Sequence, residues 1–380
     1  MKKNVFIRSV IIASIIFLSF PQAALIGQTP VRFFDTATEP HSKARLTIFY
    51  PSVGTLRDLL ALKEQGLLPA DKFEIVGVYH AKEKTNYNLS QKFVQDRNLT
   101  WIKFHEISAE LGPADLFEPN AASKEFKDIF QKSDGMIFFG GPDLPPAIYG
   151  QKTSLLTRIE DPYRHYLELS FVFHLLGGSQ NGAFQAFLEK RPNFPVLGIC
   201  LGSQTLNVGT GGTMVQDVWS DAYGKMFVED IIALGQPNWH TNPWPRLEPL
   251  DKKLLSYMLH PIKFATGCKL LTELGFKPGD QPYIMSAHHQ AAGLLGKGFK
   301  VAATSLDGKI IEAIEHTRFP HVLGVQFHPE FSMLWDAEPK YKFTPQDKEL
   351  IGINSFLEAH APSLEFHKKL WRWFFDRINK

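Results

Sequence analysis

This chain of 380 residues is poor in cysteine and lacks an excess of charge of either sign. Its formal net charge is +2, and basic and acidic residues are interspersed. That balance gives no reason to expect nucleic-acid binding, and no block of like charge indicates an interaction tail. Because 44% of the residues are hydrophobic and 21% are charged, the composition is that of a globular protein with a sizeable core.

Apolar runs are also short, and the N-terminus has the layout of a secretory signal peptide. Basic residues precede the apolar run Val10–Phe20 (VIIASIIFLSF), and small or polar residues follow it. This run is well short of the roughly 20 residues that cross a bilayer as a helix, so a permanent anchor is the less favoured alternative. We predict a signal peptide over residues 1–27, cleaved between Ala23 and Gln28. The mature protein is then periplasmic or secreted, with no stable membrane anchor.

The two cysteines, Cys200 and Cys268, would often form a disulfide in the oxidising compartment that export implies. Cys200, however, is the candidate nucleophile described below, and a nucleophile must stay reduced. A bridge between the two is therefore the less favoured alternative. We expect Cys268 to be a small core residue.

From residue 45 onward, short apolar runs alternate with segments of helical period. The pattern predicts strands at 45–50, 73–79, 101–105, 135–139 and 195–199. It predicts helices at 53–66, 89–97, 123–131 and 161–176, and another that starts just after Cys200. Strands that alternate with helices favour a parallel sheet covered on both faces, so the predicted fold class is α/β.

The pattern changes in the second half of the chain. Strands with turns between them are expected at 283–286, 299–305, 310–315 and 322–326, as the far side of the same domain. Residues 219–262 are rich in Pro, Trp and His and have no clear period, so we expect a long functional loop or lid there. Two helices, at 346–357 and 363–379, are expected to pack on the outside.

The segment PVLGICLGSQ places Cys200 in the pattern Gly-x-Cys-x-Gly, the thiol counterpart of the Gly-x-Ser-x-Gly nucleophile elbow. At such a sharp strand-to-helix turn, Gly198 and Gly202 supply positions where a side chain would collide with neighbouring backbone. The N-terminus of the following helix favours a thiolate over a thiol. On this motif alone, a buried cysteine in a glycine-rich turn remains an equal alternative.

A thiolate needs a base and a group that orients the base. The buried strand in VLGVQFHPEF (322–331) is followed by His328, and Glu330 lies two positions later. In extended chain, side chains two apart project to the same face, so Glu330 can hold the His328 ring while its other nitrogen faces Cys200. The spacing is typical of a Cys-His-Glu triad; by itself it also fits a His-Pro turn with an exposed glutamate.

A tetrahedral intermediate needs N–H donors for its oxyanion. The predicted strand GMIFF runs into GGPDLPP, where Gly140 and Gly141 leave backbone amides unobstructed. We predict that the N–H groups of Gly141 and Leu201 form the oxyanion hole. The alternative is an ordinary Gly-Gly-Pro turn.

The three motifs together resemble the class I glutamine amidotransferase superfamily. The similarity is to its gamma-glutamyl hydrolase branch, which includes the gamma-glutamyl-gamma-aminobutyrate hydrolases, and it covers roughly residues 45–335. The segments that carry it are GGPDLPPAIYG (140–150), DPYRHYLELSFVFHLL (161–176), LGICLGSQTLNVGTGGTMVQDV (197–218), SAHHQAAGLLGKGFKVAATSLDGKIIEAIE (286–315) and VLGVQFHPE (322–330).

The resemblance implies a three-layer, flavodoxin-like sandwich with a mostly parallel central sheet. It also implies hydrolysis of a gamma-glutamyl amide, an omega-peptidase type of reaction, through a thioester on Cys200, with His328 as acid/base and Glu330 as its orienting partner. Gln204 would contact the glutamyl group. The side chains of Ser286, His288, His289 and Gln290 would line the pocket near its amino and carboxylate ends, although structural hydrogen bonding is an equal alternative for the two histidines.

We expect no cofactor and no metal, because no ligand-spaced cluster surrounds His288 and His289 in the sequence. The expected organisation is a signal peptide (1–27), a linker (28–44), the hydrolase domain (45–335) and a C-terminal helical extension (336–380). The expected partner is a small gamma-glutamyl substrate; the oligomeric state stays open. Residues 177–194 and 236–249 and the C-terminal helices depart from the family pattern, so the leaving group stays open too.

Two other functions fit the same motifs. One is the glutaminase subunit of an amidotransferase, which needs a synthetase partner that an exported chain would rarely meet. The other is a binding module with an amidotransferase-like fold and no turnover. An interrupted triad would indicate such a module, and here all three positions are filled.

Overall fold

The computed structural model describes residues 31–37 and 42–378. The predicted signal peptide (1–27) lies outside the described residues. Part of the predicted linker is described: α1 (Phe33–Thr36) packs against the sheet domain, and Phe34 in it is buried. Within the described ranges, no helix has both the length and the apolar character needed to span a bilayer.

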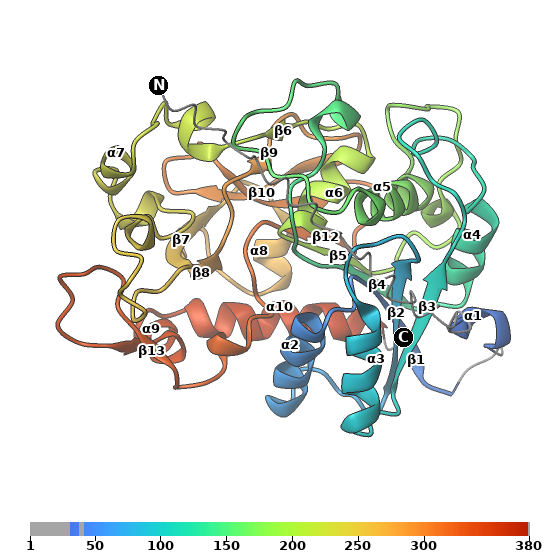
Figure 1. Ribbon diagram of the computed structural model, residues 1–380, viewed down its shortest axis with the longest axis horizontal. Coiled ribbons are helices and arrows are strands. Elements are labelled where there is room, and N and C mark those ends of the chain that lie inside the picture. Colours follow the sequence, from blue (N-terminus) through green and yellow to red (C-terminus); the bar gives the residue numbers. More distant parts are fainter. Residues whose placement is uncertain (1–30, 38–41, 379–380) are drawn as a thin grey trace, which may run out of the picture. The chain divides into compact units, whose positions relative to one another are not determined.

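A ten-stranded mixed sheet runs through the described part of the chain (Figure 1). Six neighbouring strands are parallel, in the order β3 (Ile102–Ile107), β2 (Phe73–His80), β1 (Ala44–Phe49), β4 (Gly135–Phe138), β5 (Val196–Ile199) and β12 (Val322–Val325). The sheet continues antiparallel through β11 (Ile311–His316), β10 (Phe299–Ser305), β7 (Met258–Phe264) and β8 (Tyr283–Ser286). Two small ladders join β6 (Met214–Val215) to β9 (Ala291–Ala292) and β13 (Lys340–Tyr341) to β14 (Ile351–Gly352).

Helices cover both faces of the sheet because its strands alternate their side chains between two cores. Leu46 and Ile48 of β1 belong to one core, with α2 (Val53–Glu64), α3 (Tyr87–Asp96), α8 (Lys269–Glu273) and α10 (Ser363–Ile378). Phe49, next in the chain, belongs to the other core, with α4 (Ser123–Gln131), α5 (Pro162–Leu176) and α6 (Leu201–Gly209). The predicted α/β fold with a mostly parallel sheet between two helical layers is confirmed.

Two regions differ from the sequence-based expectation. The segment expected to be a loop or lid contains a short helix, α7 (Val228–Ile232), and ends in strand β7, which pairs with β10 and β8 inside the main sheet. In the C-terminal part, α9 (Ile353–Ala359) begins later than expected, and α10 is a core element whose Trp371 and Phe374 are fully buried. The long helix therefore closes one face of the sheet instead of lying on the outside.

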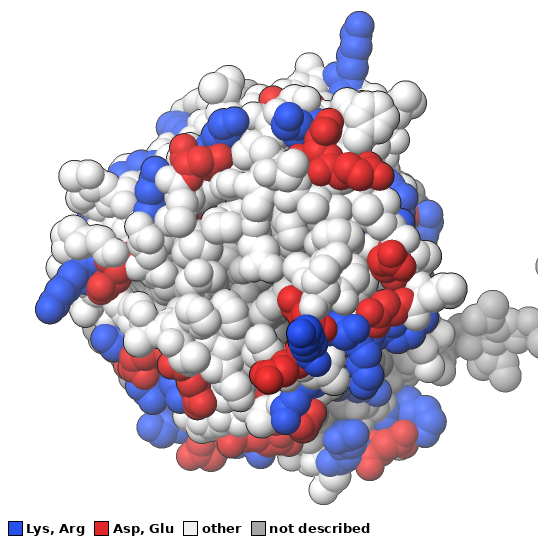
Figure 2. Space-filling model, turned by 90° about the vertical axis from the view of Figure 1, so that its left-hand side faces the viewer, with Lys and Arg blue, Asp and Glu red and all other residues white. Residues whose placement is uncertain are grey.

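One side of the described structure is shown in Figure 2. Lys and Arg alternate with Asp and Glu around its margin, and its centre carries few charges. On this face no single-sign field of the kind that attracts nucleic acid is visible, in keeping with the interspersed charge of the sequence.

Candidate active site

The candidate nucleophile Cys200 lies at the turn between β5 and α6. Its φ of 51° and ψ of −107° form a conformation that residues other than glycine rarely adopt. A Cβ on Gly198 would lie 2.6 Å from the carbonyl oxygen of Gly202, and a Cβ on Gly202 would lie 2.0 Å from that of Phe138. The structure therefore has the strained elbow that the sequence predicts. Because α6 begins at Leu201, the positive end of its dipole lies at the cysteine.

His328 and Glu330 lie beside Cys200, and all three side chains are buried. The Nδ1 atom of His328 is 2.7 Å from Oε1 of Glu330, and the same ring interacts electrostatically with the Cys200 sulfur. Burial disfavours the charged ring, but Glu330 and the sulfur outweigh it and raise the pKa of His328 to about 10. At neutral pH this arrangement favours an imidazolium next to the sulfur.

The segment that carries His328 is held by packing and by one hydrogen bond from the C-terminal helix. The ring of Phe331 stacks on His328 with centroids 4.1 Å apart. Trp371 of α10 donates from Nε1 to the carbonyl oxygen of Pro329, between His328 and Glu330, at 2.9 Å. The C-terminal helix thus supports the segment that carries His328 as well as the core.

The loop after β4, residues 139–142, carries Gly141 and is named the oxyanion loop after its predicted role. Arg164 of α5 holds it in place. Arg164 donates from Nη2 to the carbonyl oxygens of Phe139 and Gly140, at 2.8 and 2.9 Å. The Gly140 carbonyl and the Gly141 N–H belong to one trans peptide and point in opposite directions, so this N–H faces away from Arg164. No described residue accepts a backbone hydrogen bond from the N–H of Gly141 or of Leu201. Both predicted oxyanion donors are therefore free to bind a ligand.

Two glutamines lie next to the elbow. Gln326 is 3.6 Å from the Cys200 sulfur through its Nε2, and its Oε1 accepts a hydrogen bond from Gln204 at 3.2 Å. Gln204 also donates to the carbonyl oxygen of Gln290. A contact between Gln204 and a glutamyl group stays a prediction.

In the segment SAHHQ (286–290), Ser286, His288 and Gln290 contact other parts of the protein, and His289 lines a pocket. Ser286 donates to the carbonyl oxygen of His240 at 2.7 Å, and Gln290 donates to that of Gln216 at 2.9 Å. Nδ1 of His288 is 2.9 Å from the carbonyl oxygen of Gln290. These three side chains are buried, and each makes a hydrogen bond to a backbone carbonyl oxygen of the protein. For His288, this is the structural hydrogen bonding that the sequence analysis gave as an alternative to substrate contact.

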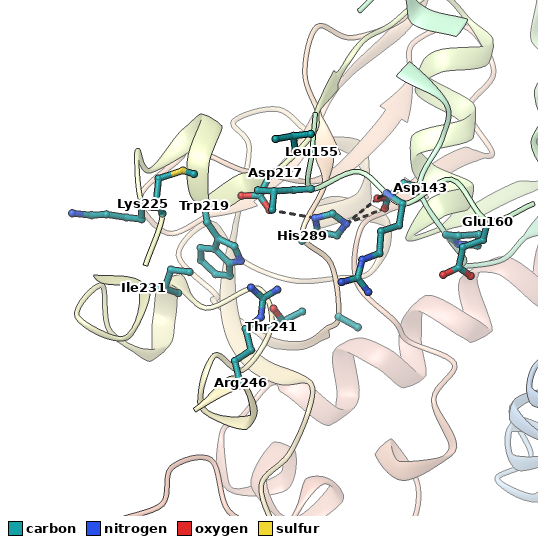
Figure 3. A pocket seen from close by; sticks show the side chains of 15 residues that line it. Asp143, Leu155, Glu160, Asp217, Trp219, Lys225, Ile231, Thr241, Arg246 and His289 are labelled. Carbon is teal, nitrogen blue, oxygen red and sulfur yellow. Dashed lines mark hydrogen bonds and ion pairs between the residues drawn. The ribbon is translucent and has the colours of Figure 1, made fainter. Parts of the chain in front are cut away.

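His289, in contrast, lies in the wall of a pocket of about 590 Å³. Figure 3 shows its ring between Asp217 and Asp143, with ring-to-carboxylate distances of 3.3 and 3.0 Å. Burial disfavours its charge, but the hydrogen bonds to the two carboxylates outweigh this and raise the pKa of His289 to about 9. The pocket wall also carries the cations Arg158, Lys225 and Arg246.

The pocket borders the oxyanion loop. Cys200 is not one of its lining residues, but Pro142 is, and Pro142 directly follows Gly141. The pocket therefore reaches the loop that carries a predicted oxyanion donor, while the buried Cys200 does not line it.

Sequence reasoning missed the residues that support the site. Arg164 and Glu168 form a fully buried ion pair at 2.8 Å, with side chains 1% exposed. The signal that could have found them is an Arg and a Glu four apart in a helix whose other residues are largely apolar. Gln326, a polar residue after a buried strand and two positions before His328, could have been found in the same way.

The structure also gathers four ligand-type side chains beneath the pocket. They are His240, His260, His288 and Glu312, all buried, with their inner donor atoms within 4.8 Å of one another. Only His288 belongs to the histidine pair that the sequence analysis considered.

The chain is similar to several bacterial proteins. It is 31% identical over 231 residues, 60% of this chain and 61% of the relative, to a Mycobacterium tuberculosis protein whose name assigns it provisionally to the glutamine amidotransferases. It is 27% identical over 221 residues, 58% of this chain and 71% of the relative, to the gamma-glutamyl-gamma-aminobutyrate hydrolase of Escherichia coli K12. The chain thus matches less than two thirds of the length of the Mycobacterium protein.

Among solved structures, a glutamine amidotransferase from Thermotoga maritima aligns with 90% of this chain and 100% of its own, at 11% identity and a TM-score of 0.38. The family model described as Peptidase C26 matches residues 74–330, which include the elbow, the oxyanion loop and the His-x-Glu segment. The chain belongs to the Peptidase C26 family of glutamine amidotransferase-like proteins.

Proposed function

We propose that this protein is a cysteine hydrolase that cleaves gamma-glutamyl amide bonds through a gamma-glutamyl thioester on Cys200. The observation that carries the proposal is the contact of the strained Cys200 with His328, whose other side is held by Glu330 at 2.7 Å. A thiolate beside an imidazolium, with an orienting carboxylate behind it, is the arrangement that amide acyl transfer to sulfur requires.

In the first half-reaction, the Cys200 sulfur attacks the gamma-carbonyl carbon, and the N–H groups of Gly141 and Leu201 bind the oxyanion. The carbon–nitrogen bond breaks as His328 gives its proton to the departing amine. In the second half, His328 takes a proton from water, the water oxygen bonds to the acyl carbon and the carbon–sulfur bond breaks. Glutamate leaves, and the thiolate–imidazolium pair is restored.

The charges in the wall of the pocket beside the oxyanion loop are evidence for a glutamyl substrate. A gamma-glutamyl group carries an ammonium and a carboxylate at its alpha carbon, and therefore needs groups of both signs. The wall carries the carboxylates of Asp143 and Asp217, both of which also pair with His289, and the cations Arg158 and Arg246. The E. coli relative is named for hydrolysis of a gamma-glutamyl compound, which points to the same substrate class.

The test is release of glutamate from gamma-glutamyl-p-nitroanilide and from gamma-glutamyl dipeptides, with Cys200→Ala as the matched control. We expect turnover by the wild type and none by the variant. If both preparations are inert over a broad panel, including folate polyglutamates, gamma-glutamyl-aminobutyrate and glutathione, the binding-module alternative is favoured. Ammonia release from glutamine only in the presence of a synthetase would favour the glutaminase alternative.

We further propose that the protein is exported, on the basis of the basic residues and the apolar run at its N-terminus. Expression of the full chain in a bacterial host, followed by mass determination of the N-terminal peptide, tests this. Cleavage between Ala23 and Gln28 is expected, and an intact N-terminus on all of the protein would contradict export by this route.

A further inference from the structure

Four buried side chains with unsatisfied inner atoms lie together beneath the pocket. Glu312 lies on β11, His260 on β7 and His288 just after β8, while His240 belongs to the segment that precedes β7. Side-chain exposure is 2% or less for each of them. The inner atoms make no hydrogen bond within the described structure. They are Nδ1 of His240, Nε2 of His260 and of His288, and both carboxylate oxygens of Glu312.

The outer nitrogens of the three imidazoles already have partners. Nδ1 of His288 faces the carbonyl oxygen of Gln290 at 2.9 Å, and Nδ1 of His260 faces that of Pro261 at 3.2 Å. A carbonyl oxygen only accepts, so each of these outer nitrogens carries the hydrogen, and in the neutral ring the inner nitrogen presents a lone pair. Nε2 of His240 is 3.4 Å from the hydroxyl of Tyr223.

Without a cation, this arrangement is unfavourable in either protonation state. Neutral rings of His260 and His288 would direct lone pairs at a buried carboxylate to which only His240 could donate, which leaves polar atoms desolvated and unpaired. Three protonated rings would place three positive charges around a single negative one, away from water. A divalent cation that accepts all four ligand atoms removes both difficulties.

The distances from Glu312 to the three histidines fit a tetrahedral metal site. The carboxylate oxygens of Glu312 lie 3.1 Å from His240 Nδ1, 3.6 Å from His260 Nε2 and 3.6 Å from His288 Nε2. For zinc bonds of about 2.0–2.2 Å, the edges of a regular tetrahedron are about 3.3–3.6 Å long. Outer hydrogen bonds from ligating histidines to carbonyl oxygens are the usual second shell of zinc sites.

We propose that this protein binds one structural Zn²⁺ ion through His240, His260, His288 and Glu312. Four protein ligands close the tetrahedron, so the ion has no open position for a substrate. The site joins the segment before β7 to the antiparallel part of the sheet. Thr241 and Ala287, the chain neighbours of two ligands, line the pocket, so the ion fixes a part of its wall.

The test is the metal content of the full chain, purified without a histidine tag and measured by mass spectrometry of the elements. We expect one zinc per chain in the wild type and none in Glu312→Gln or His260→Gln. The matched control is His367→Gln, which changes a fully buried histidine of α10 outside the cluster and should keep its zinc. Zinc retained in both ligand variants, or one equivalent of iron or manganese in its place, would overturn the proposal.

A second measurement covers the case in which the ligand variants fail to fold. Wild-type protein is stripped with a chelator and titrated with Zn²⁺ or Co²⁺. Zinc at about 100 times its dissociation constant should raise Tm by about 4 °C, and cobalt should give the intense visible absorption of tetrahedral coordination. An unchanged Tm with no bound metal would overturn the site. These readouts are independent of hydrolase activity.

Discussion

The buried ion pair of Arg164 and Glu168 offers a way to separate the positioning of the oxyanion loop from stability. In Arg164→Met, the loop carbonyls lose their donor and the Glu168 carboxylate stays buried without a partner. Both side chains are 1% exposed, so the unpaired charge should lower the free energy of unfolding by about 3–5 kcal/mol. In the double variant Arg164→Met/Glu168→Met, neither charge of this pair remains. It should regain on the order of 2 kcal/mol, with the remainder lost because two carbonyls lack donors.

Turnover should not recover with stability. Both variants lack the two hydrogen bonds, at 2.8 and 2.9 Å, that orient the peptide carrying the Gly141 N–H. Misdirection of one oxyanion donor typically lowers kcat by about 10²–10³-fold, so we expect a loss of this size in the single and the double variant alike. Urea denaturation gives the free energies, and glutamate release gives kcat and KM. A double variant that regained stability together with wild-type kcat would refute a positioning role for Arg164.

Three further changes test other parts of the site. Gly202→Ala places a Cβ 2.0 Å from a backbone carbonyl oxygen. This clash must displace the elbow, so kcat/KM for glutamate release should fall by about 10²-fold or more. The control is Gly182→Ala, which has open space around its Cβ position and should match the wild type in the same assay. Glu330→Gln should lower kcat by roughly 10³–10⁴-fold, which is less than the loss in Cys200→Ala. Because Glu330 raises the pKa of His328, the variant should also shift the alkaline limb of the pH–rate profile to lower pH. Equal losses of kcat in the two variants would contradict an orienting role. Burial, reinforced by the neighbouring Glu330, raises the pKa of Asp58 from 3.8 to about 7. Between these pH values, Asp58 is protonated in the folded protein and ionised in the unfolded chain. The free energy of unfolding therefore falls as the pH rises from 3.8 to about 7. Asp58→Asn should therefore be more stable than the wild type by on the order of 2 kcal/mol at pH 8 and equal to it at pH 4, as urea denaturation at the two pH values would show; a difference that is the same at both would contradict this origin.

The parts of the fold and site that could be predicted are those in which the signal is local. The elbow could be predicted from five consecutive residues (198–202), because a strained turn needs glycine on both sides of Cys200. His328 and Glu330 are two apart after a buried strand, so their common face follows from backbone geometry alone. The parallel strands are short apolar runs bounded by turn residues, and their positions agree with the structure to within one or two residues.

The parts that could not be predicted depend on pairing between distant segments. Strand β7 contains Pro261, which cannot donate to a ladder and argues against a strand, yet neighbours on both sides hold it in the sheet. The partners of His288 are 24 to 48 positions away in the chain, and only the fold brings them together. The spacing rules for metal ligands cover compact motifs, so a set of this kind has no signature in a single sequence.

The central claim is that Cys200 carries the acyl group during turnover. The most direct measurement is acid quenching of the wild-type protein during turnover of a gamma-glutamyl substrate, followed by mass spectrometry of the peptide that contains Cys200. We predict a mass increase of one gamma-glutamyl group at this residue, at less than stoichiometric level if thioester hydrolysis is fast. Glutamate released at the same rate by Cys200→Ala, or turnover in which the Cys200 peptide is unmodified at every quench time while another residue carries the acyl group, would contradict it.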